Sequence, residues 1–411
     1  MKAVMRIQVA ALVLLLALSG FAQAELVATH GEGWRENVDG LTVVHLAGTP
    51  HQIGVQHGIL LKDEIHFLVK YFFEDKGSLF GASVDDIRKS AKLLESNIPD
   101  EYIQEMKGVA EGSGIDYEKI LMSNIFLDVV SAHWVGVGPQ CSNFIALPEA
   151  TRDGNIVHGR NLDWSADPDL AKLNTVFIYN PRGGITFLAL GWPSIVGTLT
   201  GMNAEKMTVG EMTSVTSDAT LNGTPIMIQL RMLIERSHNL DEAYSILKDT
   251  PRTTGYNVVV ADGKTADAFF AEQSASDIFR GSAKKGLIYH TNHYTHPKMK
   301  KKQEKYFYII GKGKESDTYY RYKRLGQLLE EYHGDIDAEA GMKIMSDNFD
   351  IAINGVPEPK NMNNTVCKKN TMQSAIMLPQ SGEIYLAMKG IPSPKNGYVK
   401  FTFDPSAETG E

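Results

Sequence analysis

The character of the sequence changes at Gly136-Val137-Gly138-Pro139-Gln140, and this change constrains the fold more than any other feature. Before it, apolar residues recur at the spacing of helices. After it, short apolar runs alternate with turn residues, which predicts strands. Helices and consecutive strands that are segregated along a chain favour a layered α+β fold over a doubly wound parallel sheet. We therefore expect an α+β protein with mainly antiparallel sheets.

Residues 25–140 are expected to be mostly helical. One strand is predicted at 41–46, and Thr49-Pro50 is a typical start for the helix that follows it. The spacing of apolar residues predicts further helices at 84–98, 102–110 and 117–130.

Beyond residue 140 the pattern predicts mostly strands, with helices between groups of them. The first strands are expected at 143–147, 156–159, 176–179, 185–190, 195–200 and 207–212. Later elements are helices at 226–236, 240–248 and 319–331, and strands at 257–261, 266–271, 374–378, 383–387 and 398–403. The sequence contains no internal repeat.

The first 24 residues have the features of a secretory signal peptide. Lys2 and Arg6 give a positive start, an apolar run covers 9–18, and Ala22-Gln23-Ala24 has small residues at the outer positions of a cleavage site. The run is shorter than the roughly 20 residues that a membrane-spanning helix needs. We expect a secreted or periplasmic protein without integral membrane association once the signal is removed.

The charge of the chain argues against a nucleic-acid partner. The formal net charge is −8 over 411 residues, and removal of Lys2 and Arg6 with the signal brings it to −10. Nucleic-acid backbones bind basic surfaces, so an acidic protein is a poor match. The basic run at 298–302 is interpreted as a solvated face of the protein.

The chain has only two cysteines, Cys141 and Cys367, and they allow two interpretations. In an exported protein the default is one disulfide, which would make this a non-catalytic binding protein with a Cys141–Cys367 bridge. The alternative is that Cys141 is a nucleophile and Cys367 a buried free thiol.

The surroundings of Cys141 favour the catalytic alternative. Cys141-Ser142-Asn143-Phe144 is followed, nineteen residues after the cysteine, by Arg160-Asn161-Leu162-Asp163-Trp164. A thiol with an ordinary pKa of about 8.5 needs a base or a nearby cation to react at neutral pH. Arg160 would supply the cation, and Asp163 would hold the guanidinium or accept a hydrogen bond from an amine. Alone, such an Arg and Asp would more often form a structural ion pair.

The combined pattern resembles a known family. Cys141-Ser142-Asn143-Phe144, Asp153-Gly154-Asn155 and Gly159-Arg160-Asn161-Leu162-Asp163-Trp164 are similar to amino-terminal nucleophile (Ntn) hydrolases of the choloylglycine hydrolase and isopenicillin N acyltransferase type. Upstream, 48–58 resembles the opening helix of the acyltransferase branch. Downstream, the family's order is followed by Gly201-Met202-Asn203, Asn257, Thr291-Asn292, Arg321 and Cys367. In choloylglycine hydrolases proper the nucleophile directly follows the initiator methionine, whereas here it is internal, which places the chain with the acyltransferase-like branch.

The resemblance implies a four-layer αββα sandwich made by self-processing. After the signal peptide 1–24, a pro-region 25–140 and a catalytic chain 141–411 would be separated by a cut between Gln140 and Cys141, and would pack as one unit. The new α-amino group of Cys141 would then be the base that activates its thiol.

The resemblance also implies roles for other residues, and no cofactor. Arg160 and Asp163 would flank the nucleophile, Asn257 or Asn292 would donate to the oxyanion, and Arg321 would support the network. Each asparagine also suits ordinary backbone capping, and Arg321 also suits a solvated helix face.

The expected activity is hydrolysis or acyl transfer on a carbon–nitrogen amide bond of a small N-acyl compound, penicillin or peptide. Candidate substrate contacts are Phe144, Trp164 and Trp192, although aromatic residues of this kind are more often part of the core. The oligomeric state stays open.

Two other kinds of active site are disfavoured. Histidines in the run 290–296 lie three apart, so they do not share one face of a strand, and no set of carboxylates accompanies them; we expect a hydrogen-bonded loop and no metal. The chain has no Gly-x-Ser-x-Gly elbow, which argues against a serine hydrolase.

Overall fold

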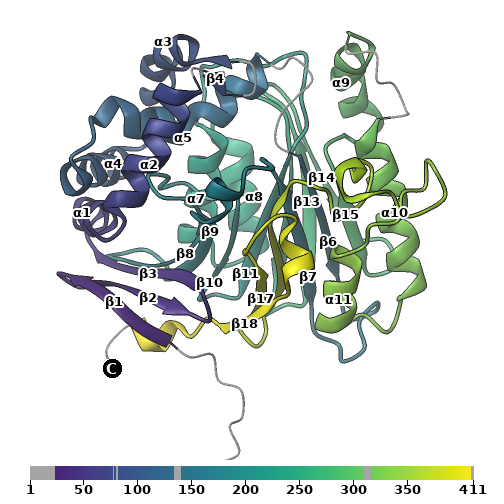
Figure 1. Cartoon of the computed structure of the whole chain (residues 1–411). Helices are drawn as coiled ribbons and strands as arrows, with labels where there is room; N and C mark the ends of the chain where they lie inside the picture. The colour runs from purple at the N-terminus through teal and green to yellow at the C-terminus, as the bar shows by residue number, and fades with distance from the viewer. Residues whose placement is uncertain (1–23, 77, 80–81, 134–139, 310–315, 409–411) are drawn as a thin grey trace, which may run out of the picture.

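Two β-sheets face each other at the centre of this computed structural model, which describes residues 24–76, 78–79, 82–133, 140–309 and 316–408 (Figure 1). The larger sheet has ten strands in the order β1-β2-β3-β8-β9-β10-β11-β12-β13-β14, and the smaller has six in the order β15-β6-β7-β16-β17-β18. Pairing is antiparallel in both sheets, except that β3 and β8 run parallel.

The strands of the ten-stranded sheet are β1 (Ala24–His30), β2 (Gly33–Val38), β3 (Leu41–Gly48), β8 (Thr175–Pro181), β9 (Phe187–Gly191), β10 (Thr200–Asn203), β11 (Met207–Thr213), β12 (Tyr256–Asp262), β13 (Asp267–Gln273) and β14 (Ile278–Ser282). Those of the six-stranded sheet are β15 (Leu287–His290), β6 (Gln140–Ala146), β7 (Val157–Asp163), β16 (Thr371–Leu378), β17 (Glu383–Ala387) and β18 (Val399–Thr402). A separate small hairpin pairs β4 (Ser78–Leu79) with β5 (Ala82–Ser83).

Helices cover the outer faces of both sheets (Figure 1). The helices on the side of the ten-stranded sheet are α1 (Pro50–Leu60), α2 (Lys62–Lys70), α3 (Val84–Glu95), α4 (Asp100–Ser113), α5 (Tyr117–Ala132), α7 (Ile226–Arg236) and α8 (Leu240–Asp249). On the side of the six-stranded sheet lie α10 (Asp317–Glu331) and α11 (Ala338–Met345). Connections contain α6 (Pro168–Ala171), α9 (Pro297–Ile309), the π-helical segment η1 (Tyr71–Asp75) and the short 3-10 helices η3 (Pro359–Asn361), η4 (Ser393–Asn396) and η5 (Pro405–Glu408).

Alternation of side chains along the strands creates the four layers. In β8, Val176 packs toward the six-stranded sheet with Ala375, whereas the next residue, Phe177, belongs to the cluster that includes the helices over the larger sheet. In the smaller sheet, Phe144 packs with Leu325 of α10. The layers are therefore helices, sheet, sheet and helices, and the predicted α+β, αββα fold is confirmed.

Several predicted elements differ from the structure. Residues before the predicted strand at 41–46 also form strands, because β1 and β2 precede β3, while helices make up most of the segment 25–140 as expected. All seven residues of β1 are exposed, which removes the apolar alternation that marks a strand. The strand expected at 195–200 is wrong: β10 begins only at Thr200.

Parts of two predicted features lie outside the described residues. These are residues 1–23 of the expected signal peptide, and residues 136–139 of the loop before Cys141. Among the residues that the structure does describe, no helix is long and apolar enough to cross a membrane.

Glycines allow α1 and α4 to pack closely. A Cβ atom added to Gly54 would lie 2.0 Å from the carbonyl oxygen of Glu105, and one added to Gly108 would lie 2.3 Å from that of His51. Backbone atoms cannot move aside as a flexible side chain can, so these positions exclude any larger residue. Through α1, the helix pair packs against β1, β2 and β3 of the ten-stranded sheet.

We predict that Gly108→Ala destabilises the protein by about 2 kcal/mol, because the overpacking cost exceeds the ~1 kcal/mol that alanine gains over glycine in a helix. The measurement is chemical denaturation of the Cys141→Ala chain with and without the substitution. Lys107→Ala, at an exposed position of the same helix, is the matched control and should change stability little. Equal stability of the Gly108→Ala variant would contradict the close helix contact.

Candidate active site

Strand pairing places Cys141 beside the Arg160–Asp163 segment. β6 begins with Gln140 and Cys141, and it forms an antiparallel hairpin with β7 in which Cys141 lies opposite Leu162 and Gln140 opposite Asp163. Cys141 is only 1% exposed. The spacing noticed in the sequence is therefore the spacing of two neighbouring strands.

Arg160 connects the thiol to the ten-stranded sheet. Its Nη2 donates to Cys141 Sγ at 3.4 Å and to the carbonyl oxygen of Glu211 at 2.9 Å, and its Nη1 donates to Thr200 Oγ1. The Glu211 carboxylate lies 3.6 Å from Nη2, and both side chains are 1% exposed. The guanidinium is thus fixed by β10 and β11 while it contacts the sulfur.

Burial keeps the thiol of Cys141 protonated. Loss of solvation on burial raises the pKa of Cys141 to about 12; the charges of Arg160 and Arg321 lower the pKa, and those of Glu211 and Asp163 raise it. Burial likewise raises the pKa of Glu211 to about 7, against the attraction of Arg160. A base next to the thiol would therefore speed nucleophilic attack.

Asn292 and Arg321 hold the backbone of Cys141. The peptide N–H of Cys141 donates to Asn292 Oδ1 at 2.8 Å, and Asn292 Nδ2 donates to the carbonyl oxygen of Thr213 at 2.9 Å. Arg321, fully buried on α10, donates from Nη1 to the carbonyl oxygen of Cys141 at 2.5 Å and from Nη2 to Asn292 Oδ1 at 2.8 Å. Arg321 therefore lies in the site and not on a solvated helix face.

Asn257 lies one step further from the nucleophile. Its Nδ2 donates to the carbonyl oxygens of Thr291 and His293, both at 2.9 Å. These two bonds, made from β12, hold the loop that carries Asn292. The structure thus brings Asn292 into contact with Cys141, and Asn257 into contact with the loop.

Asp163 lies at the end of β7 in a buried polar cluster. Its Oδ1 accepts a hydrogen bond from Thr371 Oγ1 at 2.5 Å, whereas its buried Oδ2 has no hydrogen-bond partner among the described residues. Burial raises the pKa of Asp163, and Lys368 and Arg321 lower it. An amine next to Oδ2 would find an acceptor there.

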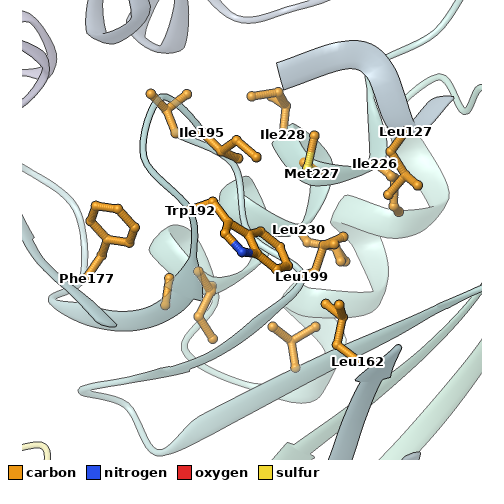
Figure 2. Packing of buried hydrophobic residues seen from close by; sticks show 14 of the residues in the cluster. Leu127, Leu162, Phe177, Trp192, Ile195, Leu199, Ile226, Met227, Ile228 and Leu230 are labelled. Atoms are coloured by element: carbon orange, nitrogen blue, oxygen red, sulfur yellow. The ribbon is translucent and has the colours of Figure 1, made fainter. Parts of the chain in front are cut away.

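The three aromatic residues that were candidate substrate contacts have different positions. Phe144 packs on the side of α10, on the opposite face of β6 from Cys141, so the structure does not bring it to the site. Trp164 and Trp192 lie in one apolar cluster with Cys141 and Leu162, and their rings meet edge to face at 4.5 Å. Figure 2 shows Trp192 among apolar side chains, which include Leu127, Leu162, Leu199 and Leu230.

Both cysteines are free and buried. Cys367 lies in the loop before β16, where its N–H donates to the carbonyl oxygen of Asp347. The alternative of a Cys141–Cys367 disulfide has no support in the structure. Within the described ranges, no group of His, Cys, Asp and Glu side chains is placed to hold a metal ion.

Four functional candidates were missed by sequence reasoning: Glu211, Thr200, Lys368 and Thr371. The last three carry no local signal, because only the packing of the sheets and the 364–371 loop brings them to the site. Glu211 did carry one. A carboxylate in the middle of the apolar run Met207–Thr213 must be buried, and a buried carboxylate requires a partner.

We predict that Glu211→Gln flattens the pH dependence of stability between about pH 4.5 and 7. Because the pKa of Glu211 rises from 4.5 to about 7 on folding, the folded chain binds the extra proton in this window, so stability falls as pH rises through it, by up to about 3 kcal/mol. The measurement is urea denaturation at several pH values in the Cys141→Ala background.

The control is Glu149→Gln, at an exposed position, which should leave the pH dependence unchanged. A Glu211→Gln variant that loses stability with rising pH as steeply as its parent would contradict a buried Glu211 that is protonated at acidic pH.

The described site agrees with a known family. Residues 150–390, more than half of the chain, match the model of the family described as acyl-coenzyme A:6-aminopenicillanic acid acyl-transferase. The chain therefore belongs to this family. The match contains Arg160, Asp163, Asn257, Asn292 and Arg321, and it begins after Cys141.

Several relatives and solved structures are similar to the chain. The dcd1B protein of Dictyostelium discoideum is 28% identical over 57% of this chain and 50% of its own length. The N-acylethanolamine-hydrolyzing acid amidase of Caenorhabditis elegans is 27% identical over 36% of this chain and 42% of its own. A solved structure, described as a C. elegans orthologue of N-acylethanolamine-hydrolyzing acid amidase, has a TM-score of 0.42 at 18% identity. The match covers 64% of this chain and 100% of the chain in that structure.

The chain spans between one half and three fifths of the length of the first curated relatives it matches. Family membership confirms the prediction, made from the sequence, that the chain is an Ntn hydrolase of the choloylglycine hydrolase-like group. The description of the family names an acyltransferase, which agrees with the enzyme class predicted from the sequence.

Proposed function

We propose that this protein is an exported, self-processing cysteine Ntn hydrolase that cuts its own chain between Gln140 and Cys141 and then cleaves, or transfers the acyl group of, a linear amide. One observation carries the proposal: the nitrogen, sulfur and carbonyl oxygen of Cys141 are each held by a different side chain, namely Asn292, Arg160 and Arg321. A structural cysteine has no need of such contacts.

Self-cleavage would begin with the thiol. Sγ of Cys141 attacks the carbonyl carbon of Gln140, the C–N bond breaks, and the nitrogen takes the thiol proton to become an α-amine. Water then adds to the thioester, and the C–S bond breaks to leave a carboxylate on Gln140 and a thiol on Cys141. Arg321 and Asn292 hold the Cys141 backbone during both steps.

The new amine would supply the base that the uncut chain lacks. An α-amino group has an ordinary pKa of about 7.7–8.0, so it can take the thiol proton at working pH. Asn292 Oδ1 already accepts the hydrogen on this nitrogen, and the unpartnered Oδ2 of Asp163 lies on the residue opposite Gln140. Arg160 would stabilise the thiolate.

Asn292 suits the role of oxyanion donor better than Asn257. A side-chain amide carries two N–H hydrogens, and among the described residues only one of those of Asn292 is engaged, with the carbonyl oxygen of Thr213. Both hydrogens of Asn257 are engaged with the backbone of the 291–293 loop. We assign Asn292 as the donor and Asn257 as the residue that positions it.

The substrate would be a small acyl amide with an apolar acyl part. Trp164 and Trp192 provide apolar surface in the cluster that contains Cys141. Relatives and solved structures with a similar fold include an N-acylethanolamine-hydrolyzing acid amidase, a conjugated bile acid hydrolase and a penicillin V acylase. N-acylethanolamines, conjugated bile acids, penicillin V, N-acyl homoserine lactones and short peptides form the first substrate panel.

Self-cleavage is the first prediction of this proposal. Denaturing electrophoresis and intact mass measurement of the purified wild type should find one chain that ends at Gln140 and one that begins at Cys141. Cys141→Ala should stay whole, and Cys141→Ser should cut more slowly because an alcohol is harder to ionise. Cys367→Ala is the matched control and should cut like the wild type. A wild type that remains one chain would contradict the proposal and favour the alternative of a non-catalytic binding protein.

The oxyanion assignment gives a second prediction. Asn292→Ala should lower kcat for an accepted amide by about two to three orders of magnitude with little change in KM, because an oxyanion donor acts in the transition state. The measurement requires processed enzyme, with active sites counted by thiol titration. Asn257→Gln should change kcat less, since it acts through the loop. A larger loss at Asn257 than at Asn292 would reverse the assignment.

A further inference from the structure

Lys368 is a buried lysine at the scissile bond that the mechanism above does not use. Its side chain is 6% exposed, and it lies in the loop before β16. Its Nζ forms an ion pair with Asp317 Oδ2 at 2.7 Å and donates a hydrogen bond to Gln140 Oε1. A buried ammonium needs several acceptors, and the amide of Gln140 is one of them.

The partner of Lys368 connects it to the other side of the scissile bond. Asp317 begins α10, and Arg321, one turn later on the same helix, lies 3.8 Å from its carboxylate. Arg321 donates to the carbonyl oxygen of Cys141. One charge network therefore contacts the side chain of Gln140 at one end and the backbone of Cys141 at the other.

The backbone of Lys368 is anchored as well. Its N–H donates to Thr371 Oγ1 at 2.9 Å, and Thr371 Oγ1 donates to Asp163 Oδ1 at 2.5 Å. Asp163 lies opposite Gln140 in the β6–β7 pair. The lysine is thus fixed relative to the strand that carries residue 140, so its ammonium can hold the side chain of that residue in one position.

We propose that Lys368 is a positioning residue for self-cleavage, which recognises a hydrogen-bond acceptor in the side chain of residue 140. The inference rests on the proposed self-cleavage and adds to it a requirement on the residue before the cut. Attack by Sγ requires the carbonyl carbon of Gln140 to lie close to the sulfur and in the right orientation for bond formation. The Lys368 contact restricts rotation of residue 140, while Arg321 restricts Cys141.

The contact concerns the cut and not later turnover. Once the bond is broken, Gln140 ends the small chain and is no longer joined to Cys141, whereas the acyl group in turnover comes from the substrate. Substitutions of Gln140 should therefore change the rate of self-cleavage, but leave kcat per processed active site unchanged. A substitution that only disturbed the structure would alter both.

The test is a double-mutant cycle on the rate of self-cleavage. Gln140→Met keeps the length of the side chain and removes the acceptor, and Lys368→Met removes the donor. Full-length chain is made in a cell-free translation reaction, and the first-order appearance of the 141–411 chain is followed by denaturing electrophoresis. Each single variant should cut about tenfold more slowly than the wild type, since hydrogen bonds to charged groups are among the stronger ones.

In the cycle, Gln140→Met should add little to the slowing that Lys368→Met has already caused. Lys368→Arg, which keeps a cationic donor, should recover part of the rate. Lys369→Met, the exposed neighbour, is the matched control and should cut at the wild-type rate. If Lys368→Met fails to fold, Gln140→Met against the wild type decides the question alone.

The outcomes separate this inference from the proposed function. A wild type that never cuts overturns both. A wild type that cuts, together with a Gln140→Met variant that cuts equally fast, overturns the role of Lys368 and leaves self-processing standing. Additive effects of the two substitutions, or a lowered kcat in processed Gln140→Met enzyme, would also overturn it.

Discussion

The contact of Arg160 with Glu211 between the two sheets is the interaction on which the site depends. It requires the strands to approach closely, and Gly210 makes this possible, because a Cβ there would lie 2.5 Å from Asn143 Oδ1. Arg160 then reaches from the six-stranded sheet to Glu211 and Thr200 in the ten-stranded sheet. Since Cys141 lies on the strand next to Arg160, the position of the thiol relative to both sheets follows from this contact.

The interior between the sheets is therefore divided. Part of it is apolar, where Val176 and Ala375 pack, and part is a polar layer beside the site. In that layer His158 Nδ1 bonds Thr208 Oγ1 at 2.8 Å and Nε2 bonds Asn143 Oδ1 at 3.2 Å, while burial lowers the pKa of His158 to about 3. A neutral histidine between two fixed partners connects the sheets without adding a charge. In this polar layer the positive charge beside the sulfur therefore comes from Arg160.

The sequence predicts the parts of the site that are local. Cys141 and Arg160 lie on two consecutive strands joined by residues 147–156, so their proximity can be predicted from the strand lengths and from the turn at Asp153-Gly154, where Gly154 has a φ of +76°. Asn292 and Arg321 came from the resemblance and not from spacing. Lys368 could not be found in either way, because its contact with residue 140 joins segments 228 residues apart.

The same distinction holds for the fold. The layered α+β class follows from the segregation of helices and strands, which is a property of local patterns. The exposed strand β1 escapes such reasoning, because a strand without a buried face has no alternation to detect. The parallel pairing of β3 with β8 escapes it too, since it joins residues 41–48 to residues 175–181 across the predicted cut. Long-range pairing is decided by packing, which no window of sequence contains.

The charges around Cys141 explain why a cut would be needed for activity. The charges that act on the thiol balance in sign: the cations are Arg160 and Arg321, and the anions are Asp163 and Glu211. A balanced set cannot offset the cost of burying a thiolate, so the pKa of the thiol stays near 12. If the chain is cut as proposed, the peptide nitrogen bound by Asn292 becomes an amine, and a base appears within the same residue. Activation then requires one new functional group at a fixed place, and no rearrangement of the sheets.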